Sequence, residues 1–280
     1  MSALGLGLLA AFAWGVHDLC VRYVSQRTGI LPALVTVLGV GAIIVLPIAA
    51  WLGNWGDMSG PAYGYSVLSG VTFAGAGYGL YKAFEIGPVR LVAPVIGAFP
   101  VLSLAAAGLD GEPVLATQWL AASAVIVGIA VVAVLIKGAE SNGSRSAAIG
   151  WAVLGAIGFA ATFATGQHAS REGAELPVLL VTRLAAVVLI LPVVLMRSDT
   201  SRGLGGQLPL LVVLGALDAI ALGAVMVAAP LGNPEFAAVA ASTFGIITII
   251  LAGIFLGERM SLGQWGGVLI AFSGIGYLAL

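Results

Sequence analysis

Apolar residues occur in long, nearly unbroken runs along the chain, and each run is close to the ~20 residues that a helix needs to cross a bilayer. Short turn-forming clusters rich in Gly, Pro, Asn and Asp separate the runs. A closed β-barrel would instead alternate apolar and polar residues in segments of about ten. The pattern predicts an all-α integral membrane protein with spans at about 3–24, 31–52, 62–84, 89–109, 114–136, 147–168, 177–196, 207–229, 234–256 and 262–280.

Composition supports this interpretation. Hydrophobic residues make up 60% of the chain and charged residues 8%, whereas a soluble domain carries about 25% charged residues. The net charge of -1 offers no basic stripe for nucleic acid. The single cysteine, Cys20, excludes an internal disulfide, and no metal or cofactor motif is expected. No Lys or Arg precedes the first apolar run, which argues against a cleaved signal peptide.

The two halves of the sequence, 1–138 and 146–280, match each other at an offset of 145 residues, with one later slip of a single residue. The matched residues are types that seldom coincide by chance: Pro32 with Pro177, Pro47 with Pro192, Gly87 with Gly232, Glu112 with Glu258, Gln118 with Gln264 and Trp119 with Trp265. Each half holds five predicted spans, so the second copy enters the membrane from the opposite side. Such inverted repeats are typical of secondary transporters, whose substrate binds near the midplane.

Several stretches carry a family resemblance: Trp14-Gly15, Tyr81 to Pro88, Val92-Ala93-Pro94, Gly111-Glu112, and Leu256 to Gly267. Over its whole length the sequence resembles the EamA-type transporters of the drug/metabolite transporter superfamily. The resemblance implies a ten-helix transporter of small metabolites in the inner membrane of a cell. It also implies a central cavity lined mainly by helices 1, 3, 4, 6, 8 and 9, and it favours export over uptake. It does not name the solute, because the family moves amino acids, amines, sugars and other solutes.

Ionisable residues inside predicted spans are candidate site residues, because a charge at mid-bilayer costs about 2.5–3.5 kcal/mol on insertion scales. His17 and Asp18 lie in the first span, and Asp18 shares a helix face with Trp14. A carboxylate beside an aromatic ring suits a cationic or ammonium-bearing solute. The alternative is a structural pair of Asp18 with His17 or with Arg22.

Asp218 lies near the centre of the eighth span, with no basic residue in its own helix. Unless another helix supplies a partner, we expect this carboxyl group to be protonated, as proton-coupled transport would require. A neutral, hydrogen-bonded Asp218 is the alternative. Arg183 lies about two turns into the seventh span, where it either pairs with an acid of another helix, reaches the interface, or binds a solute carboxylate.

Aromatic residues are expected to complete the site. Tyr78 and Tyr81 lie on one stripe of the third span with Lys82 and Glu85. We interpret Glu85 mainly as an interfacial residue, whereas for Lys82 an interfacial and a cavity position both stay open. Phe159 and Phe163 occupy the repeat positions of Trp14 and Asp18 in the sixth span. The predicted solute-binding residues are Trp14, His17, Asp18, Tyr78, Tyr81, Phe159, Phe163, Arg183 and Asp218.

The orientation has two opposing indications. Nine Lys and Arg residues flank the odd-numbered connections, and Arg171 alone flanks the even-numbered ones. Positive charge favours the cytoplasm, so this count puts both termini outside. The usual description of EamA-type proteins puts both termini inside.

The apolar spans and the inverted repeat favour a carrier over an enzyme or a channel. The sequence lacks the HExxH, phosphate-loop and GxSxG motifs of enzymes, and a single inverted repeat does not form the ring of charges or carbonyls of a channel. We predict a carrier of a small nitrogenous metabolite, such as an amine or amino acid; an integral membrane enzyme is the alternative. The expected partners are a small-molecule solute and the lipid bilayer, without nucleic acid or cofactor, and a homodimer stays an open alternative.

Overall fold

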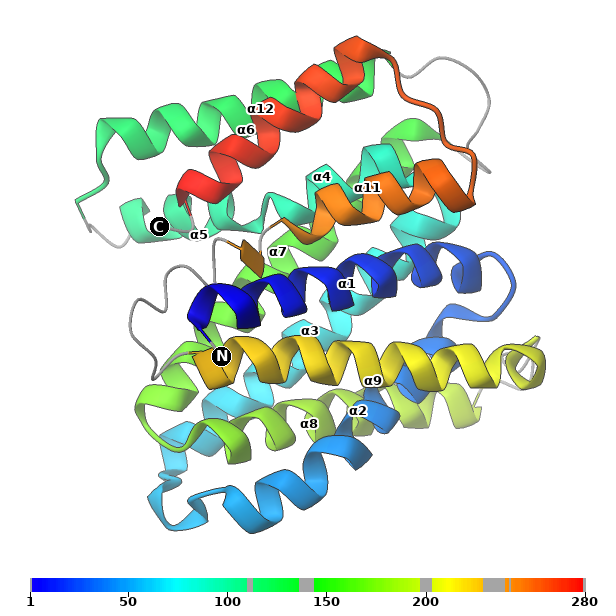
Figure 1. Cartoon of the computed structure of the whole chain (residues 1–280). Coiled ribbons are helices and arrows are strands. Elements are labelled where there is room, and N and C mark those ends of the chain that lie inside the picture. Colours follow the sequence, from blue (N-terminus) through cyan, green and yellow to red (C-terminus); the bar gives the residue numbers. More distant parts are fainter. Residues whose placement is uncertain are drawn as a thin grey trace.

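The computed structural model describes residues 2–109, 113–135, 144–196, 203–228, 240–241 and 243–278, and these residues contain helices and no strand. Figure 1 shows the bundle that they form. A short 3-10 helix, η1, spans Trp55–Asp57. The α-helices are α1 (Ala3–Ser25), α2 (Ile30–Leu52), α3 (Gly60–Ile86), α4 (Val89–Gly97), α5 (Phe99–Leu109), α6 (Ala116–Leu135), α7 (Arg145–Arg171), α8 (Glu175–Met196), α9 (Leu204–Ala228), α11 (Phe244–Phe255) and α12 (Leu262–Leu278).

The helices follow the predicted spans closely. Six of them, α1, α2, α6, α7, α8 and α9, are long and apolar enough to cross a membrane. Helix α3 is less apolar, but its 27 residues extend about 40 Å at ~1.5 Å per residue, more than the ~30 Å of a bilayer core. The predicted span at 234–256 is described only in part, since most of its first ten residues lie outside the described ranges.

Polar side chains at the helix starts explain several of the boundaries. The Ser2 and Ser59 hydroxyls accept hydrogen bonds from the first turns of α1 and α3, at 3.2 and 3.1 Å. Ser261 and Gln264 form a reciprocal capping box at α12, in which the backbone N–H of Ser261 donates to the Gln264 side chain at 2.8 Å. The repeat counterpart Gln118 accepts from Leu115 N–H at 2.9 Å. These hydrogen bonds fix where α12 and α6 begin.

The fourth predicted span is two helices, α4 and α5. Helix α4 contains Pro94 and is followed by Ala98, and Pro100 lies in the first turn of α5. Each proline removes a backbone donor and disfavours a continuous helix around it. The sequence pattern predicted one continuous span at 89–109, so the break is a correction to that prediction.

Helix packing repeats across a pseudo-two-fold relation between the halves. Helix α3 packs on α7 and α8, and its repeat counterpart α9 packs correspondingly on α1 and α2. Helix α4 contacts α7, as α11 contacts α1. Helices α2 and α8, and α6 and α12, each pack against their own counterparts and lie on opposite sides of the bundle (Figure 1). This arrangement confirms the predicted all-α fold of two inverted five-helix repeats.

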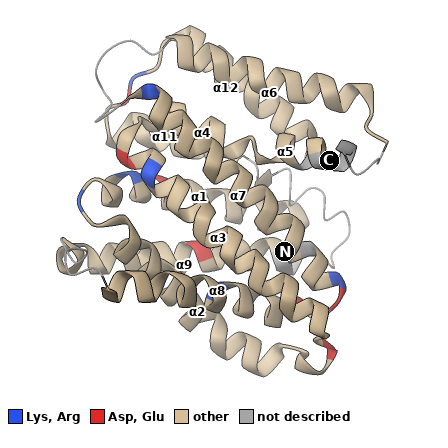
Figure 2. Cartoon of the chain, turned by 180° about the vertical axis from the view of Figure 1, so that it is seen from behind, with Lys and Arg blue, Asp and Glu red and all other residues tan. Residues whose placement is uncertain are grey.

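The helix ends and described connections that follow odd-numbered spans gather at one end of the bundle. A side chain at Gly203, before α9, would lie 3.3 Å from the Arg27 carbonyl carbon after α1. Arg90 at the start of α4 donates to the Arg259 carbonyl before α12. Figure 2 shows most Lys and Arg residues at this end, which we call the basic end. Helix α1 begins and α12 ends at the other end (Figure 1). Of the nine basic residues counted above, Lys137, Arg197 and Arg202 lie outside the described ranges.

Glycines let α6 and α12 approach closely. A Cβ atom at Gly267 would lie 2.8 Å from the Gly128 carbonyl oxygen, closer than van der Waals contact permits. Gly128 in turn faces the Gly267 carbonyl oxygen. Association of helices in lipid depends on such close packing, because lipid supplies no hydrophobic force between them.

Gly267→Leu is therefore expected to destabilise the protein by about 2 kcal/mol or more, since overpacking alone costs ~1–3 kcal/mol. The neighbouring Gly266→Leu is the matched control, because a side chain at Gly266 meets no described atom within 4 Å. Thermal unfolding in detergent measures both variants. Equal losses of stability would show that the α6–α12 contact is not tight.

Candidate functional site

A charged pair lies buried between α8 and α9. Arg183 has no exposed surface, and Asp218 is 8% exposed. Arg183 Nη2 lies 2.8 Å from Asp218 Oδ2. This is a close contact of opposite charges, but its geometry is not that of a hydrogen bond. Arg183 thus pairs with an acid of another helix, and Asp218 has the basic partner that its own helix lacks.

Asp218 is also held from α1. The Trp14 indole N–H donates to Asp218 Oδ1 at 3.3 Å. The edge of the Trp14 ring packs on Phe244 of α11, with ring centroids 6.1 Å apart. The carboxylate thereby joins α1 of the first repeat to α8 and α9 of the second.

His17 and Asp18 form a second buried pair. Nδ1 of His17 lies 2.9 Å from Oδ1 of Asp18, and the two residues are 6% and 4% exposed. Asp18 lies close enough to Asp218 for the carboxylates to repel each other. The structural alternative of an Asp18–Arg22 pair is wrong, because Arg22 donates instead to the carbonyl groups of Phe84 and Glu85.

Tyr81 of α3 lies beside these acids. Its side chain is 1% exposed, and it is within electrostatic range of both Asp18 and Asp218. Its hydroxyl group has no hydrogen-bond partner among the described residues. We name Trp14, His17, Asp18, Tyr81, Arg183 and Asp218 the charged cluster.

The remaining predicted site residues lie beside this cluster or away from it. Phe159 packs edge-on against Phe73, with centroids 6.2 Å apart, and the Phe73 ring centroid lies 6.0 Å from Arg183 Cζ. Tyr78 packs instead on Trp151 of α7, at 5.5 Å. Phe163 packs on Phe99 of α5, at 5.0 Å. Phe159 is therefore one ring away from Arg183, whereas Tyr78 and Phe163 contact other aromatic residues.

Sequence reasoning missed Phe73, Phe244 and Gly41. Gly41 of α2 faces the guanidinium group, and a Cβ atom there would lie 3.1 Å from Arg183 Cζ. The repeat offset of 145 residues relates Phe73 to Asp218, and Phe99 to Phe244. Comparing the halves position by position would therefore have drawn attention to both phenylalanines.

The basic end carries contacts that join the two repeats. Glu258, in the connection before α12, accepts hydrogen bonds from the backbone N–H groups of Val89 at 3.0 Å and Arg90 at 3.2 Å. Its carboxylate therefore caps the start of α4 in the other repeat. Lys82 and Glu85 pair with each other at the end of α3, and both side chains are partly exposed.

Glu258→Ala should cost about 1–2 kcal/mol of stability, the range of a lost N-terminal cap. Glu258→Gln should cost less, because it keeps one acceptor oxygen. Glu85→Ala is the control, since a partly exposed ion pair contributes only ~0–1 kcal/mol. Thermal unfolding in detergent compares the three variants, and a loss in Glu85→Ala as large as that in Glu258→Ala would contradict the capping role.

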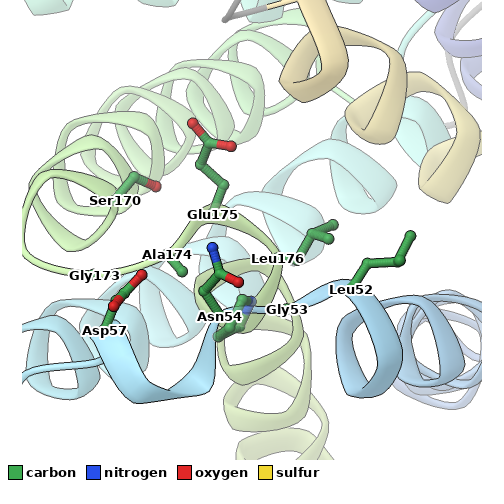
Figure 3. Close-up of a pocket in the computed structure, with 10 residues that line it drawn as sticks. Leu52, Gly53, Asn54, Asp57, Ser170, Gly173, Ala174, Glu175 and Leu176 are labelled. Carbon is green, nitrogen blue, oxygen red and sulfur yellow. The ribbon is translucent and has the colours of Figure 1, made fainter.

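A pocket of about 270 Å³ lies at the end opposite the basic end (Figure 3). The connection from α2 to α3 and that from α7 to α8 form it, with Asn54, Asp57, Ser170 and Glu175 among its lining residues. No residue of the charged cluster lines it. Pro177, at its edge, precedes Arg183 by six residues on α8, which corresponds to about 9 Å along the helix.

A sequence profile of the EamA-like transporter family matches residues 1–134 and 146–280. The chain belongs to this family. The chain is therefore a multi-pass membrane protein of the drug/metabolite transporter type. Nineteen chains of solved structures also match. One of them, from a crystal structure, is 15% identical, and its alignment covers 98% of this chain and 94% of that chain with a TM-score of 0.66; this likeness shows a shared fold. No curated protein gave a match.

For an EamA-like transporter, the charged cluster is a better candidate solute site than the pocket. A carrier of this architecture exposes one central site to each side in turn. The cluster takes residues from α1 and α3 of the first repeat and from α8 and α9 of the second. The pocket lies at one end only, among exposed residues such as Asp57 and Glu175.

Proposed function

We propose that this EamA-like transporter is a secondary carrier of a small nitrogenous metabolite, an amine or an amino acid. The observation that carries the proposal is the charged cluster, which lies buried between the two repeats of an otherwise apolar bundle. Asp18 and Asp218 supply negative charge for the nitrogen of the solute, and Trp14 supplies an aromatic face. Buried charges within membrane spans are costly, and they mark solute and ion pathways.

Alternating access follows from rocking one repeat against the other around this cluster. At the basic end, Arg22 joins α1 to the end of α3, and Glu258 joins the second repeat to α4. The Glu258 contact joins the two repeats and therefore favours a state that is closed at the basic end, and opening there requires that this cap is released. We further propose that transport runs in the export direction, which is the direction that the family resemblance favours.

Counter-flow in proteoliposomes tests the function. Vesicles that contain the purified protein are loaded with unlabelled amines or amino acids, and uptake of the labelled solute is followed from outside. A carrier gives saturable uptake that the internal solute accelerates. Uptake without acceleration would indicate a channel, and chemical conversion of the solute without uptake would favour the membrane enzyme.

We propose that the basic end faces the cytoplasm of the inner membrane, so that both termini lie outside. A reporter that is active only in the periplasm, fused after Leu280, is expected to be active if the excess of Lys and Arg at the odd-numbered connections governs insertion. A reporter that fluoresces only in the cytoplasm, fused at the same position, is the control. Cytoplasmic fluorescence would show that the usual topology of the family prevails over the charge count.

A further inference from the structure

We infer that the solute carries both a carboxylate and an ammonium group, as an amino acid does, and that its carboxylate replaces Asp218 on Arg183. The ammonium group then binds between Asp18 and the released Asp218. This inference rests on the proposed carrier function and narrows its solute from nitrogenous metabolites in general to zwitterions. Under this inference, amines without a carboxylate are not solutes of the carrier.

The inference that the solute has a carboxylate rests on buried hydrogen-bond donors that lack a well-aligned acceptor. None of the N–H groups of Arg183 makes a well-aligned hydrogen bond to a described residue, and the Tyr81 hydroxyl is likewise without a partner among them. Both side chains are almost wholly buried. A planar guanidinium group matches a carboxylate through two parallel hydrogen bonds, and the buried Tyr81 hydroxyl, within electrostatic range of the same acids, is a further donor. These donors favour an incoming oxyanion.

The inference that the solute has an ammonium group rests on the two acidic residues. Asp18 and Asp218 bring two carboxylates to a cluster whose one permanent cation is Arg183, so an ammonium group finds a counter-charge there. A solute with only a carboxylate would bring a third negative group near two others. A solute with only an amine would leave Arg183 on Asp218 without a well-aligned hydrogen bond, and the Tyr81 hydroxyl without an acceptor. A zwitterion satisfies the donors and the acceptors together.

The resting Arg183–Asp218 pair gives this exchange a function in the transport cycle. A carrier has to return through the membrane without its solute, and isolated charges in the bilayer are costly. The internal pair balances Arg183 when the site is empty, and the solute carboxylate balances it when the site is loaded. Because a zwitterion adds no net charge, the cluster has the same net charge in both states.

A matched set of charge forms tests the inference on the full-length protein. The probes are leucine, 3-methylbutylamine and 4-methylpentanoate, with the same three forms of phenylalanine and of alanine, all at neutral pH. Thermal stabilisation and competition for counter-flow are measured for each probe. We expect at least one amino acid to bind about tenfold or more tightly than its amine and its acid, because the amine offers no acceptor to the buried donors and the acid leaves Asp218 without a counter-charge.

The possible results separate this inference from the proposed function. If an amine binds and is carried as well as its amino acid, the zwitterion inference is wrong and the nitrogenous carrier stands. If a carboxylic acid without nitrogen binds best, or if none of the probes binds or is carried, both are wrong.

Tyr81→Phe gives a second test that does not depend on removing a charge. The variant keeps the ring and its packing but removes the hydroxyl donor. We expect about fivefold weaker binding of the amino acid and an unchanged affinity for the amine, because only the carboxylate uses the hydroxyl group. Tyr78→Phe, whose ring packs on Trp151, is the control and should change neither. Equal losses for the amino acid and the amine in Tyr81→Phe would overturn the assignment.

Discussion

Asp218→Ala is expected to destabilise the protein by about 3–5 kcal/mol, which is the range for breaking one side of a buried ion pair. The reason is that Arg183 has no exposed surface and lies 2.8 Å from the carboxylate that the substitution removes. The guanidinium group would remain charged and buried without a counter-charge. Reversible unfolding in mixed micelles measures the change in the free energy of unfolding.

The double variant Arg183→Leu with Asp218→Ala should recover most of this loss, because replacing a buried pair by apolar residues is often neutral. Asp57→Ala is the matched control, since Asp57 is exposed in the connection between α2 and α3. A double variant as unstable as the single one would show that the charges do not depend on each other. The double variant should still lose solute binding.

Asp18→Asn is expected to keep the fold and to abolish transport. Asparagine has a similar volume and can still hydrogen-bond His17, so packing in α1 is retained. The variant lacks the charge for the solute nitrogen, and a lost charge-assisted hydrogen bond of ~1.5–3 kcal/mol lowers affinity at least about tenfold. Counter-flow at subsaturating and saturating solute, with the unfolding temperature of the same preparation, measures both properties.

Asp57→Asn makes the same chemical change in the pocket at the end opposite the basic end, and transport should remain normal. If Asp18→Asn transports normally while Asp57→Asn does not, the solute site lies at the pocket. That result would leave the His17–Asp18 pair with a structural role alone.

Much of the fold could be predicted, because its determinants are local. The length of each apolar run sets the number of spans, and residues such as Ser59 and Ser261 mark helix starts through hydrogen bonds within one turn. The matched Pro, Gly and Trp residues of the two halves, with five spans in each half, predicted the inverted symmetry. The break between α4 and α5 was missed because Pro94 and Pro100 each allow a kinked but continuous helix as well as a break.

The members of the charged cluster could be predicted individually, and the His17–Asp18 pair was among the alternatives, but the partner of Arg183 could not be named. Each one is a polar residue in an apolar span, which is an unusual position that the sequence displays directly. Arg183 and Asp218 belong to different helices, and their contact depends on the rotation of α8 and α9 about their axes. The sequence left open which acid pairs with Arg183, and the structure shows that Arg183 and Trp14 both contact the Asp218 carboxylate.

Tyr78 and Tyr81 illustrate the same limit. They share one stripe of α3, yet Tyr81 lies within electrostatic range of Asp18 and Asp218 whereas Tyr78 packs on α7. Helix α3 is surrounded by several other helices, so residues one turn apart meet different neighbours. Sequence spacing predicts the shared stripe but not which helix covers each part of it.

The central claim is that the charged cluster binds the solute. A structure of the protein in complex with the solute that passes the counter-flow screen tests it most directly. The account predicts that the solute lies against Asp18, Tyr81 and Arg183, with Asp218 moved away from the guanidinium group. A solute bound in the pocket beside Asp57 and Glu175, with the Arg183–Asp218 pair intact, would contradict it.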